Sequence, residues 1–193
     1  MASIDEITSK FRELKMPAMA DHISQLFSTE EFSKYSTLEI IEQLIEQEQI
    51  SRKNHTIERR IKQAYLTDSH ARLEEIDYRA ERNINQALID QLKTNEYILD
   101  GRNVLILGAT GCGKTFLANA LAVNACEDTF RVKYFRMIEL LSNLSTARFE
   151  GNVGRLYRQY GNVDLLVIDD FLLTDTTANE QRPDGNIRIQ RQR

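Results

Sequence analysis

A short loop rich in glycine, ending in a lysine and a threonine, is the strongest chemical signal in the sequence. Residues 108–115 read Gly-Ala-Thr-Gly-Cys-Gly-Lys-Thr, which is the spacing of a phosphate-binding loop. Glycines let backbone N–H groups wrap closely around a phosphate chain, while the lysine adds positive charge and the hydroxyl suits Mg²⁺. The loop therefore predicts a nucleotide site. The residues expected to line it are Gly108, Ala109, Thr110, Gly111, Cys112, Gly113, Lys114, Thr115 and Phe116.

Two adjacent carboxylates end a second apolar run. Residues 164–170 read Asp-Leu-Leu-Val-Ile-Asp-Asp, so Asp169 and Asp170 stand where a buried strand would end. In an ATPase with a phosphate loop, an acid at that place serves Mg²⁺, and the next acid can orient or deprotonate the attacking water. Taken alone, such a pair is more typical of a cap or a turn. Together with the phosphate loop, it predicts a magnesium site.

Alternating segments of strand and helix character must position these residues. The β-branched run 103–107 predicts a buried strand directly before the loop, and residues 116–126 predict a helix directly after it. Residues 131–135 and 164–170 predict two further strands, with helices between them. This alternation predicts the α/β class and a three-layer P-loop NTPase core.

The first hundred residues have a different character. They contain 13 Lys and Arg against 19 Asp and Glu, whereas residues 101–193 contain 12 against 10 together with all eight glycines. Ser3 followed by Glu6 is the pattern of a capping box, and apolar residues recur at helical spacing. Between residues 46 and 55 the apolar stripe thins, which leaves open a continuous solvated helix or a break. We expect an all-α module over residues 1–95, before a core of residues 96–182.

A cluster of basic residues stands out within this acidic half. It comprises Arg52, Lys53, Arg59, Arg60 and Lys62. One interpretation is a patch that binds nucleic acid or a partner protein. The other is a solvated helix face, in which Glu58 pairs with Lys62 one turn away.

Length and composition exclude several classes of protein. The chain has 193 residues, and no run approaches the roughly 18 apolar residues that a membrane-spanning helix needs. Its acidic start differs from a signal peptide. Cys112, Cys126 and three separate histidines lack both disulfide density and metal-ligand spacing. We therefore expect a cytoplasmic protein with neither a zinc site nor a membrane partner.

Several segments together resemble one family. The phosphate loop, the run 132–136 and the spacing to residues 165–170 are similar to an IstB-like ATP-binding protein, an AAA+ ATPase that assists insertion-sequence transposases. Residues 59–64 and 73–78 resemble the amino-terminal region of that family, and the likeness extends to about Arg182. The resemblance implies an AAA+ fold, ATP and Mg²⁺ as ligands, and a role in DNA transposition. Its implied partners are DNA, the transposase of the same insertion sequence and further copies of the chain.

The resemblance also implies roles for individual residues. Lys114 contacts the β and γ phosphates, Thr115 binds Mg²⁺, and Asp169 stands behind the metal. Asp170 occupies the place where many AAA+ members have a catalytic Glu, so its shorter side chain predicts slower hydrolysis. The expected catalytic residues are therefore Lys114, Asp169 and Asp170. The DNA-facing candidates, each with ordinary surface charge as its alternative, are Arg59, Arg60, Lys62, Lys133, Arg136, Arg155 and Arg158.

The last eleven residues break the pattern. Pro183 and Gly185 interrupt a helical stretch, and no apolar face follows. The segment can be translated back into codons that encode an amphipathic helix when they are read in another frame. We therefore interpret residues 183–193 as an aberrant tail after a frameshift. In the family the strand order is 5-1-4-3-2, so the strand before the loop lies between strands four and five. This chain has candidates for strands one to three alone, so its sheet is incomplete and the strand before the loop lacks both partners. This interpretation predicts weakened ATP binding, little hydrolysis, poor solubility and impaired self-association, and leaves enzymatic activity undecided.

Two other functions compete with a transposition helper. One is a loader of a replicative helicase of the DnaC type, which would bind a helicase instead of a transposase. The other is a non-catalytic remnant whose helical half binds DNA or a partner protein. Partner binding by residues 1–95, unaffected by Lys114→Ala, would favour the remnant.

Overall fold

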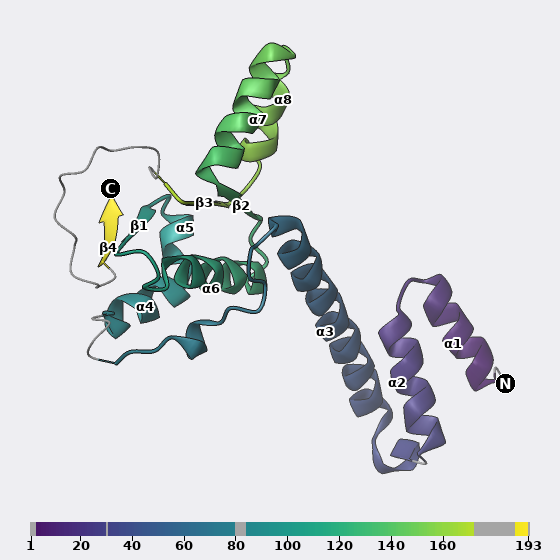
Figure 1. Cartoon of the computed structure of the whole chain (residues 1–193). Helices are drawn as coiled ribbons and strands as arrows, with labels where there is room; N and C mark the ends of the chain where they lie inside the picture. Colours follow the sequence, from purple (N-terminus) through teal and green to yellow (C-terminus); the bar gives the residue numbers. More distant parts are fainter. Residues whose placement is uncertain (1–2, 30, 80–83, 172–187, 193) are drawn as a thin grey trace, which may run out of the picture. The chain divides into compact units, whose positions relative to one another are not determined.

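The computed structural model describes residues 3–29, 31–79, 84–171 and 188–192, and it divides into two compact units (Figure 1). The first unit is Met1–Glu58 and the second is Arg59–Arg193, so the boundary falls inside one long helix, α3 (Thr37–Ala64). The chain is mixed α/β with a short parallel sheet, which confirms the predicted fold class.

The first unit is built from helices. Two of them begin with capping boxes, because the Ser3 hydroxyl accepts from the Glu6 N–H at 3.2 Å and the Ser36 hydroxyl accepts from the Glu39 N–H at 3.3 Å. In both pairs the serine N–H also donates to the glutamate carboxylate. The core of the unit consists of Ile23, Leu26, Ile40 and Leu44. Its elements are α1 (Ile4–Glu13), α2 (Pro17–Ser28), η1 (Glu31–Lys34) and the first part of α3.

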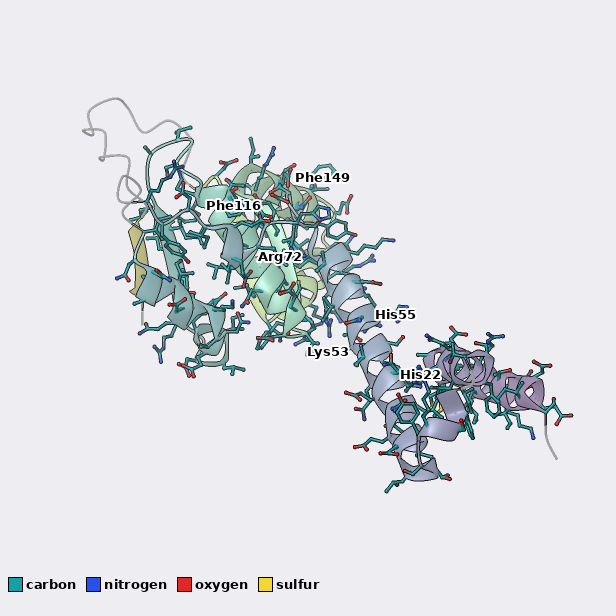
Figure 2. The ribbon with its side chains drawn as sticks, turned by 90° about the horizontal axis from the view of Figure 1, so that it is seen from below. His22, Lys53, His55, Arg72, Phe116 and Phe149 are labelled. Atoms are coloured by element: carbon teal, nitrogen blue, oxygen red, sulfur yellow. The ribbon has the colours of Figure 1, made fainter. Side chains whose placement is uncertain are left out.

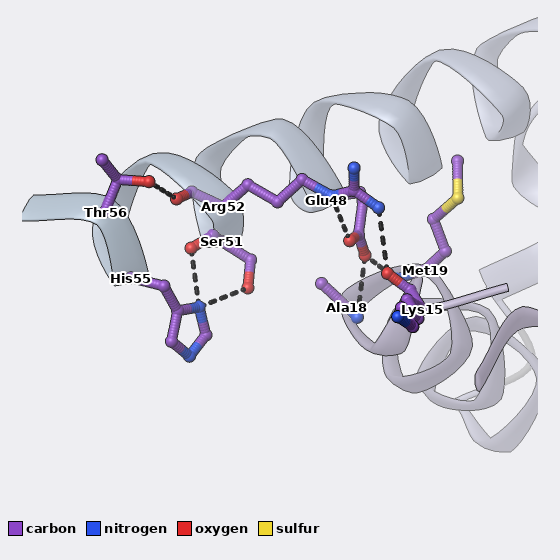
Figure 3. Close-up of polar contacts among 8 residues, drawn as sticks. All are labelled: Lys15, Ala18, Met19, Glu48, Ser51, Arg52, His55 and Thr56. Atoms are coloured by element: carbon purple, nitrogen blue, oxygen red, sulfur yellow. Dashed lines mark hydrogen bonds and ion pairs between the residues drawn. The ribbon is translucent and has the colours of Figure 1, made fainter. Parts of the chain in front are cut away.

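A buried carboxylate from α3 caps the start of α2 (Figure 3). Pro17 opens α2, and Met16 before it makes no side-chain cap, so the first N–H groups of this helix need another acceptor. Glu48, which is only 6% exposed, fills that role. Its Oε2 accepts from the N–H of Ala18 at 3.0 Å and from the N–H of Met19 at 3.3 Å.

Arg52 completes this cap. Its Nε donates to Glu48 Oε1 at 2.8 Å, and its guanidinium also donates to the Lys15 carbonyl at 2.9 Å. Burial alone would raise the pKa of Glu48, but the hydrogen bond from Arg52 and those from the α2 N–H groups hold it below its ordinary value. One member of the basic cluster therefore has a structural task within the first unit.

The polar stretch of α3 is a continuous helix, which settles the question that the thinning apolar stripe left open. Side chains in this stretch bond to the backbone one turn earlier. The Thr56 hydroxyl donates to the Arg52 carbonyl at 2.9 Å, and His55 Nδ1 lies 2.8 Å from the Ser51 carbonyl (Figure 3). The helix therefore continues without an apolar stripe through residues 46–55.

The second unit surrounds a central buried helix, α6 (Lys114–Glu127). Leu117, Ala120 and Leu121 of α6 pack in one core cluster, and Ala122, Ala125 and Cys126 pack in another. The elements around it are η2 (Leu73–Glu75), α4 (Gln86–Lys93), α5 (Glu96–Leu99), β1 (Asn103–Leu107), β2 (Val132–Arg136), α7 (Met137–Phe149), α8 (Val153–Gly161), β3 (Leu165–Asp169) and β4 (Arg188–Gln192).

Residues 59–95 belong to this second unit, whereas the sequence placed them with the helical module. Ala64, in the last turn of α3, is buried in the cluster formed by α6 and Val132. Leu73, Ile89 and Leu92 are buried in the other core cluster of this unit. Apolar residues at helical spacing show that a helix is amphipathic, but they do not show which core receives its apolar face. The functional division at residues 95/96 stays a prediction.

The described strands form two separate pairs. β2 and β3 are parallel, with Val132 opposite Leu165 and Arg136 opposite Asp169. β1 pairs with β4 in antiparallel orientation and, within the described residues, with no other strand. The separation of β1 from β3 agrees with the expected strand order. The expectation that β1 is left wholly unpaired needs one correction: the tail strand β4 pairs with it, because strand pairing uses backbone groups that any sequence carries.

Helices α7 and α8 form a hairpin beside the β2–β3 pair (Figure 1). Leu140 and Ala147 of α7 are buried, but several large apolar side chains of the hairpin face solvent. Phe149, labelled in Figure 2, is 95% exposed, and Ile138 is 70% exposed. The hairpin therefore buries only one of its faces within the described part of the chain.

Candidate functional site

The glycine-rich loop connects the end of β1 to the start of α6, as the sequence predicts. Gly111 and Gly113 have φ values of 79° and 99°, in the left-handed region that strains residues with a Cβ. A Cβ added at Gly111 would meet nothing within 4 Å. The loop therefore needs glycine there for its backbone conformation, and open space lies beside it.

The start of α6 has features that suit an anion. Gly113 is the N-cap residue and has no side chain to accept from the first N–H groups of the helix. Those groups and the positive end of the helix dipole favour a negative ligand. The Lys114 ammonium lies at the same place and donates to the Ala109 carbonyl of the loop at 2.7 Å.

Two other loop side chains belong to the core. Cys112 and Phe116 are half-buried against the cluster that contains Leu117 and Tyr97. The Cys112 N–H lies 3.4 Å from the Ala109 carbonyl, which closes the turn of the loop. The Cys112 side chain therefore has a packing role. Cys126 is fully buried, and burial raises the pKa of its thiol to about 11.

The structure brings Asp169, at the end of β3, to the first turn of α6. The Thr115 hydroxyl donates to Asp169 Oδ2 at 2.8 Å across a sequence separation of 54 residues. The Tyr134 hydroxyl of β2 donates to the same oxygen at 2.6 Å, and the Asp170 N–H donates to Oδ1 at 2.9 Å. Burial alone would raise the pKa of Asp169, but these three hydrogen bonds and the charge of Lys114 lower it. Asp169 is therefore ionised at neutral pH.

Asp170 adopts a left-handed backbone conformation, with φ of 54°, and its side chain is exposed. Aspartate tolerates this conformation better than most residues. The sharp turn separates the directions of the two carboxylates, so that Asp169 faces Thr115 and Asp170 faces solvent. Its role toward an attacking water stays a prediction.

The donor set fits a magnesium ion that is also bound by phosphate. A hydroxyl has one proton and two lone pairs, so Thr115 can donate to Asp169 and still offer oxygen to a metal. Mg²⁺ typically takes only one or two protein ligands and completes its shell with phosphate and water. Within the described residues there is no group of three or more His, Cys, Asp or Glu arranged as a self-sufficient metal site.

The predicted DNA-facing residues occupy different environments. Lys133 donates to the Gln63 carbonyl at 2.6 Å and lies 4.3 Å from the centre of the Tyr65 ring, and burial lowers its pKa. The Nε atom of Arg60 is buried without a hydrogen-bond partner. Arg158 Nε donates to the Gly154 carbonyl at 3.2 Å. Those that are exposed to solvent are Arg59, Lys62, Arg136, Arg155 and Arg158.

Tyr134 is the site residue that the sequence motifs missed. It belongs to no phosphate-loop pattern, and its role depends on the pairing of β2 with β3. One signal was available, because Tyr134 alternates with Lys133 and Phe135 and so shares the inner face of the strand with Val132. A tyrosine on a buried face needs a partner for its hydroxyl.

Comparisons with known proteins agree with this geometry. A family profile described as "IstB-like ATP binding protein" matches residues 9–182. An insertion-sequence ATP-binding protein of Sinorhizobium fredii is 36% identical over 172 residues, covering 89% of this chain and 69% of the relative. The IS1162 ATP-binding protein of Pseudomonas fluorescens is 32% identical over 171 residues, covering 89% of this chain and 74% of the relative. No helix in the described part of the chain is long and apolar enough to cross a membrane. The chain belongs to the family of IstB-like ATP-binding proteins.

Proposed function

We propose that this chain binds Mg·ATP at residues 108–115 and acts as an ATP-dependent helper of a transposase on DNA. The observation that carries the proposal is the contact between Thr115 and Asp169 beside the uncapped start of α6. The relatives named as insertion-sequence ATP-binding proteins support both the ligand and the setting.

In this proposal each residue has a separate task. The loop N–H groups surround the phosphates, and Lys114 exchanges its bond to the Ala109 carbonyl for the outer phosphates. Thr115 and Asp169 hold Mg²⁺, which neutralises charge on the β and γ phosphates. Asp170 is our candidate for the group that orients the attacking water.

A titration tests the binding step directly. The full chain is titrated with ATP in millimolar Mg²⁺ and followed by calorimetry, beside Lys114→Ala and Lys93→Ala. Lys93 is a matched control because it is an exposed lysine of the same unit, paired with Glu74. We expect saturable binding that Lys114→Ala weakens about 100-fold and Lys93→Ala preserves. Absence of binding by the unaltered chain at millimolar Mg·ATP would overturn the proposal.

The role on DNA rests on the exposed cations. Arg59 and Lys62 lie close together in sequence on α3 and are exposed, as are Arg136 and Arg155. Each phosphate contact contributes about 0.9 to the slope of log affinity against log salt concentration. We expect Arg59→Ala combined with Lys62→Ala to lower that slope by about 1.8 for duplex DNA, and Lys93→Ala to leave it unchanged. An unchanged slope in the double variant would remove α3 from the DNA interface.

The transposase role has its own test. Copurification of the full chain with the transposase of the same insertion sequence is measured with ATP, with ADP and without nucleotide. We expect a complex that ATP strengthens. Binding that is equal in all three states would contradict an ATP-dependent helper, and binding to a replicative helicase in its place would favour the loader function.

A further inference from the structure

One oxygen of Asp169 accepts hydrogen bonds from two hydroxyl groups. The first donor, Thr115, belongs to the phosphate loop. The second donor, Tyr134, comes from β2 and makes the shorter contact, 2.6 Å against 2.8 Å. Short hydrogen bonds to an ionised oxygen are stronger than those between neutral groups. The carboxylate is therefore held by a residue outside the phosphate loop and the two-acid motif.

Tyr134 is itself tightly held. Its side chain is 4% exposed, and the parallel pairing places it opposite Val167, two residues before Asp169 on β3. Burial, and secondly the hydrogen bond to Asp169, together raise the pKa of Tyr134 to about 12. The phenol therefore stays protonated and remains a donor at any physiological pH.

A buried amide fixes the other side of the same site. Asn119 of α6 is fully buried, and its Nδ2 donates to the Thr67 hydroxyl and to the Thr115 carbonyl, both at 2.8 Å. Its Oδ1 accepts from the Asp68 N–H at 3.3 Å. The segment directly after α3 is thereby connected through Asn119 to Thr115, one of the two residues that donate to Asp169.

We propose that Tyr134 is a positioning residue for the metal: its hydroxyl holds Asp169 Oδ2 toward Thr115, while Asn119 fixes the backbone of Thr115. This inference rests on the proposed function, since it concerns Mg²⁺ bound together with ATP. Without the Tyr134 hydroxyl, the carboxylate keeps only the Thr115 donor on that oxygen and can rotate away. Groups that orient metal ligands typically change metal affinity by about 10–100-fold.

We expect the loss of the Tyr134 hydroxyl to weaken the binding of Mg²⁺ and not the binding of metal-free ATP. The loop N–H groups and Lys114 hold the phosphates and do not involve Tyr134. Loss of the phenol hydroxyl therefore leaves the affinity for metal-free ATP unchanged and lowers the gain in affinity that Mg²⁺ provides. A purely structural role of Tyr134 would weaken both affinities together, because it would damage the loop as well as the carboxylate.

The test compares Tyr134→Phe with Tyr97→Phe in the full chain. Tyr97 is a matched control because it is also buried, and burial alone raises the pKa of its hydroxyl to about 12. The dissociation constant for ATP is measured in EDTA and in millimolar Mg²⁺, and the ratio of the two values gives the metal gain. We expect Tyr134→Phe to lower this ratio about tenfold at unchanged affinity in EDTA, and Tyr97→Phe to leave the ratio unchanged.

A double-mutant cycle completes the test. In the Asp169→Asn background, Tyr134→Phe should lower the ratio no further, because the group that Tyr134 positions is already altered. A metal gain that Tyr134→Phe leaves intact would overturn the inference while the proposed function stands. Equal losses in EDTA and in Mg²⁺ would show a structural role and would also overturn it. Absence of any metal gain in the unaltered chain would instead refute the proposed magnesium site, and the inference with it.

Discussion

The helices α2 and α6 both begin without a side-chain cap from the preceding residue, but they differ in what lies near their first N–H groups. Neither Met16 before α2 nor Gly113 before α6 makes a side-chain cap. At α2 the chain itself supplies a carboxylate, since Glu48 accepts from two N–H groups of the first turn. At α6 the chain supplies glycines and the cation of Lys114. The fold closes the first start, and in the proposed function the second receives the phosphates of ATP.

The two carboxylates that accompany these helices differ in the same way. Glu48 is occupied by backbone N–H groups and the guanidinium of Arg52, which have no lone pairs to share. Asp169 accepts from the hydroxyls of Thr115 and Tyr134, and a hydroxyl can contact a metal with its oxygen while it donates its proton. Burial therefore produces a structural clamp in one unit and a metal-compatible site in the other.

The largest expected effect is the loss of the cation at the open helix start. Lys114→Ala removes a charged side chain that contacts the loop backbone at Ala109. A hydrogen bond to a charged group is worth up to about 3 kcal/mol, so the affinity for ATP should fall about 100-fold by calorimetry. A loss below about threefold would mean that the loop amides alone hold the phosphates.

A smaller effect is expected at the metal-compatible carboxylate. Asp169→Asn keeps the size of the side chain and removes its charge, so the affinity for ATP in EDTA should be preserved. The gain from Mg²⁺ should fall by about 10–100-fold in the same titrations. Glu150→Gln, an exposed carboxylate of the second unit, serves as the control and should change neither value.

At the start of α2, we expect a substitution of the capping carboxylate to change the stability of the helix and not the affinity for ATP. Glu48→Gln removes the charge that holds two N–H groups and Arg52, and we expect the opening of α2 to become easier by about 1–2 kcal/mol. Hydrogen exchange of the α2 amides in the full chain measures this. Glu46→Gln, an exposed neighbour on α3, is the control. Unchanged exchange in Glu48→Gln would show that the cap adds nothing to α2.

Acid should weaken the same clamp by a smaller amount. The pKa of Glu48 is lowered in the fold, so its contribution to stability is present above its unfolded pKa and is lost as pH falls through the folded value. We expect exchange of the α2 amides, corrected for intrinsic rates, to accelerate below about pH 4.5. The acceleration should be weaker in Glu48→Gln; an equal pH dependence in both chains would assign it to other groups.

The features that the sequence predicted correctly are those set by local order. The strand before the loop, the loop itself and the helix after it follow from consecutive residues, and so does the capping box at Ser3. The sequence also placed Asp169 at the end of a buried strand and expected it to serve the same metal as Thr115; the structure brings these two side chains together across 54 residues.

The remaining features depend on which elements pack together. Tyr134 reaches Asp169 because β2 pairs with β3 in one register, and a shift by one residue would turn the ring to the other face. The placement of residues 59–95 with α6 depends on which core receives their apolar faces. β4 pairs with β1 in antiparallel orientation, a pairing that no residue pattern in the sequence predicted.

The central claim is that the start of α6 is the open anion site and the start of α2 is closed. Hydrogen exchange of the full chain with and without Mg·ATP measures both in a single experiment. We predict that Mg·ATP slows exchange over residues 108–118 and leaves residues 16–20 unchanged. No protection of residues 108–118 at saturating Mg·ATP, or equal protection of both helix starts, would contradict the claim.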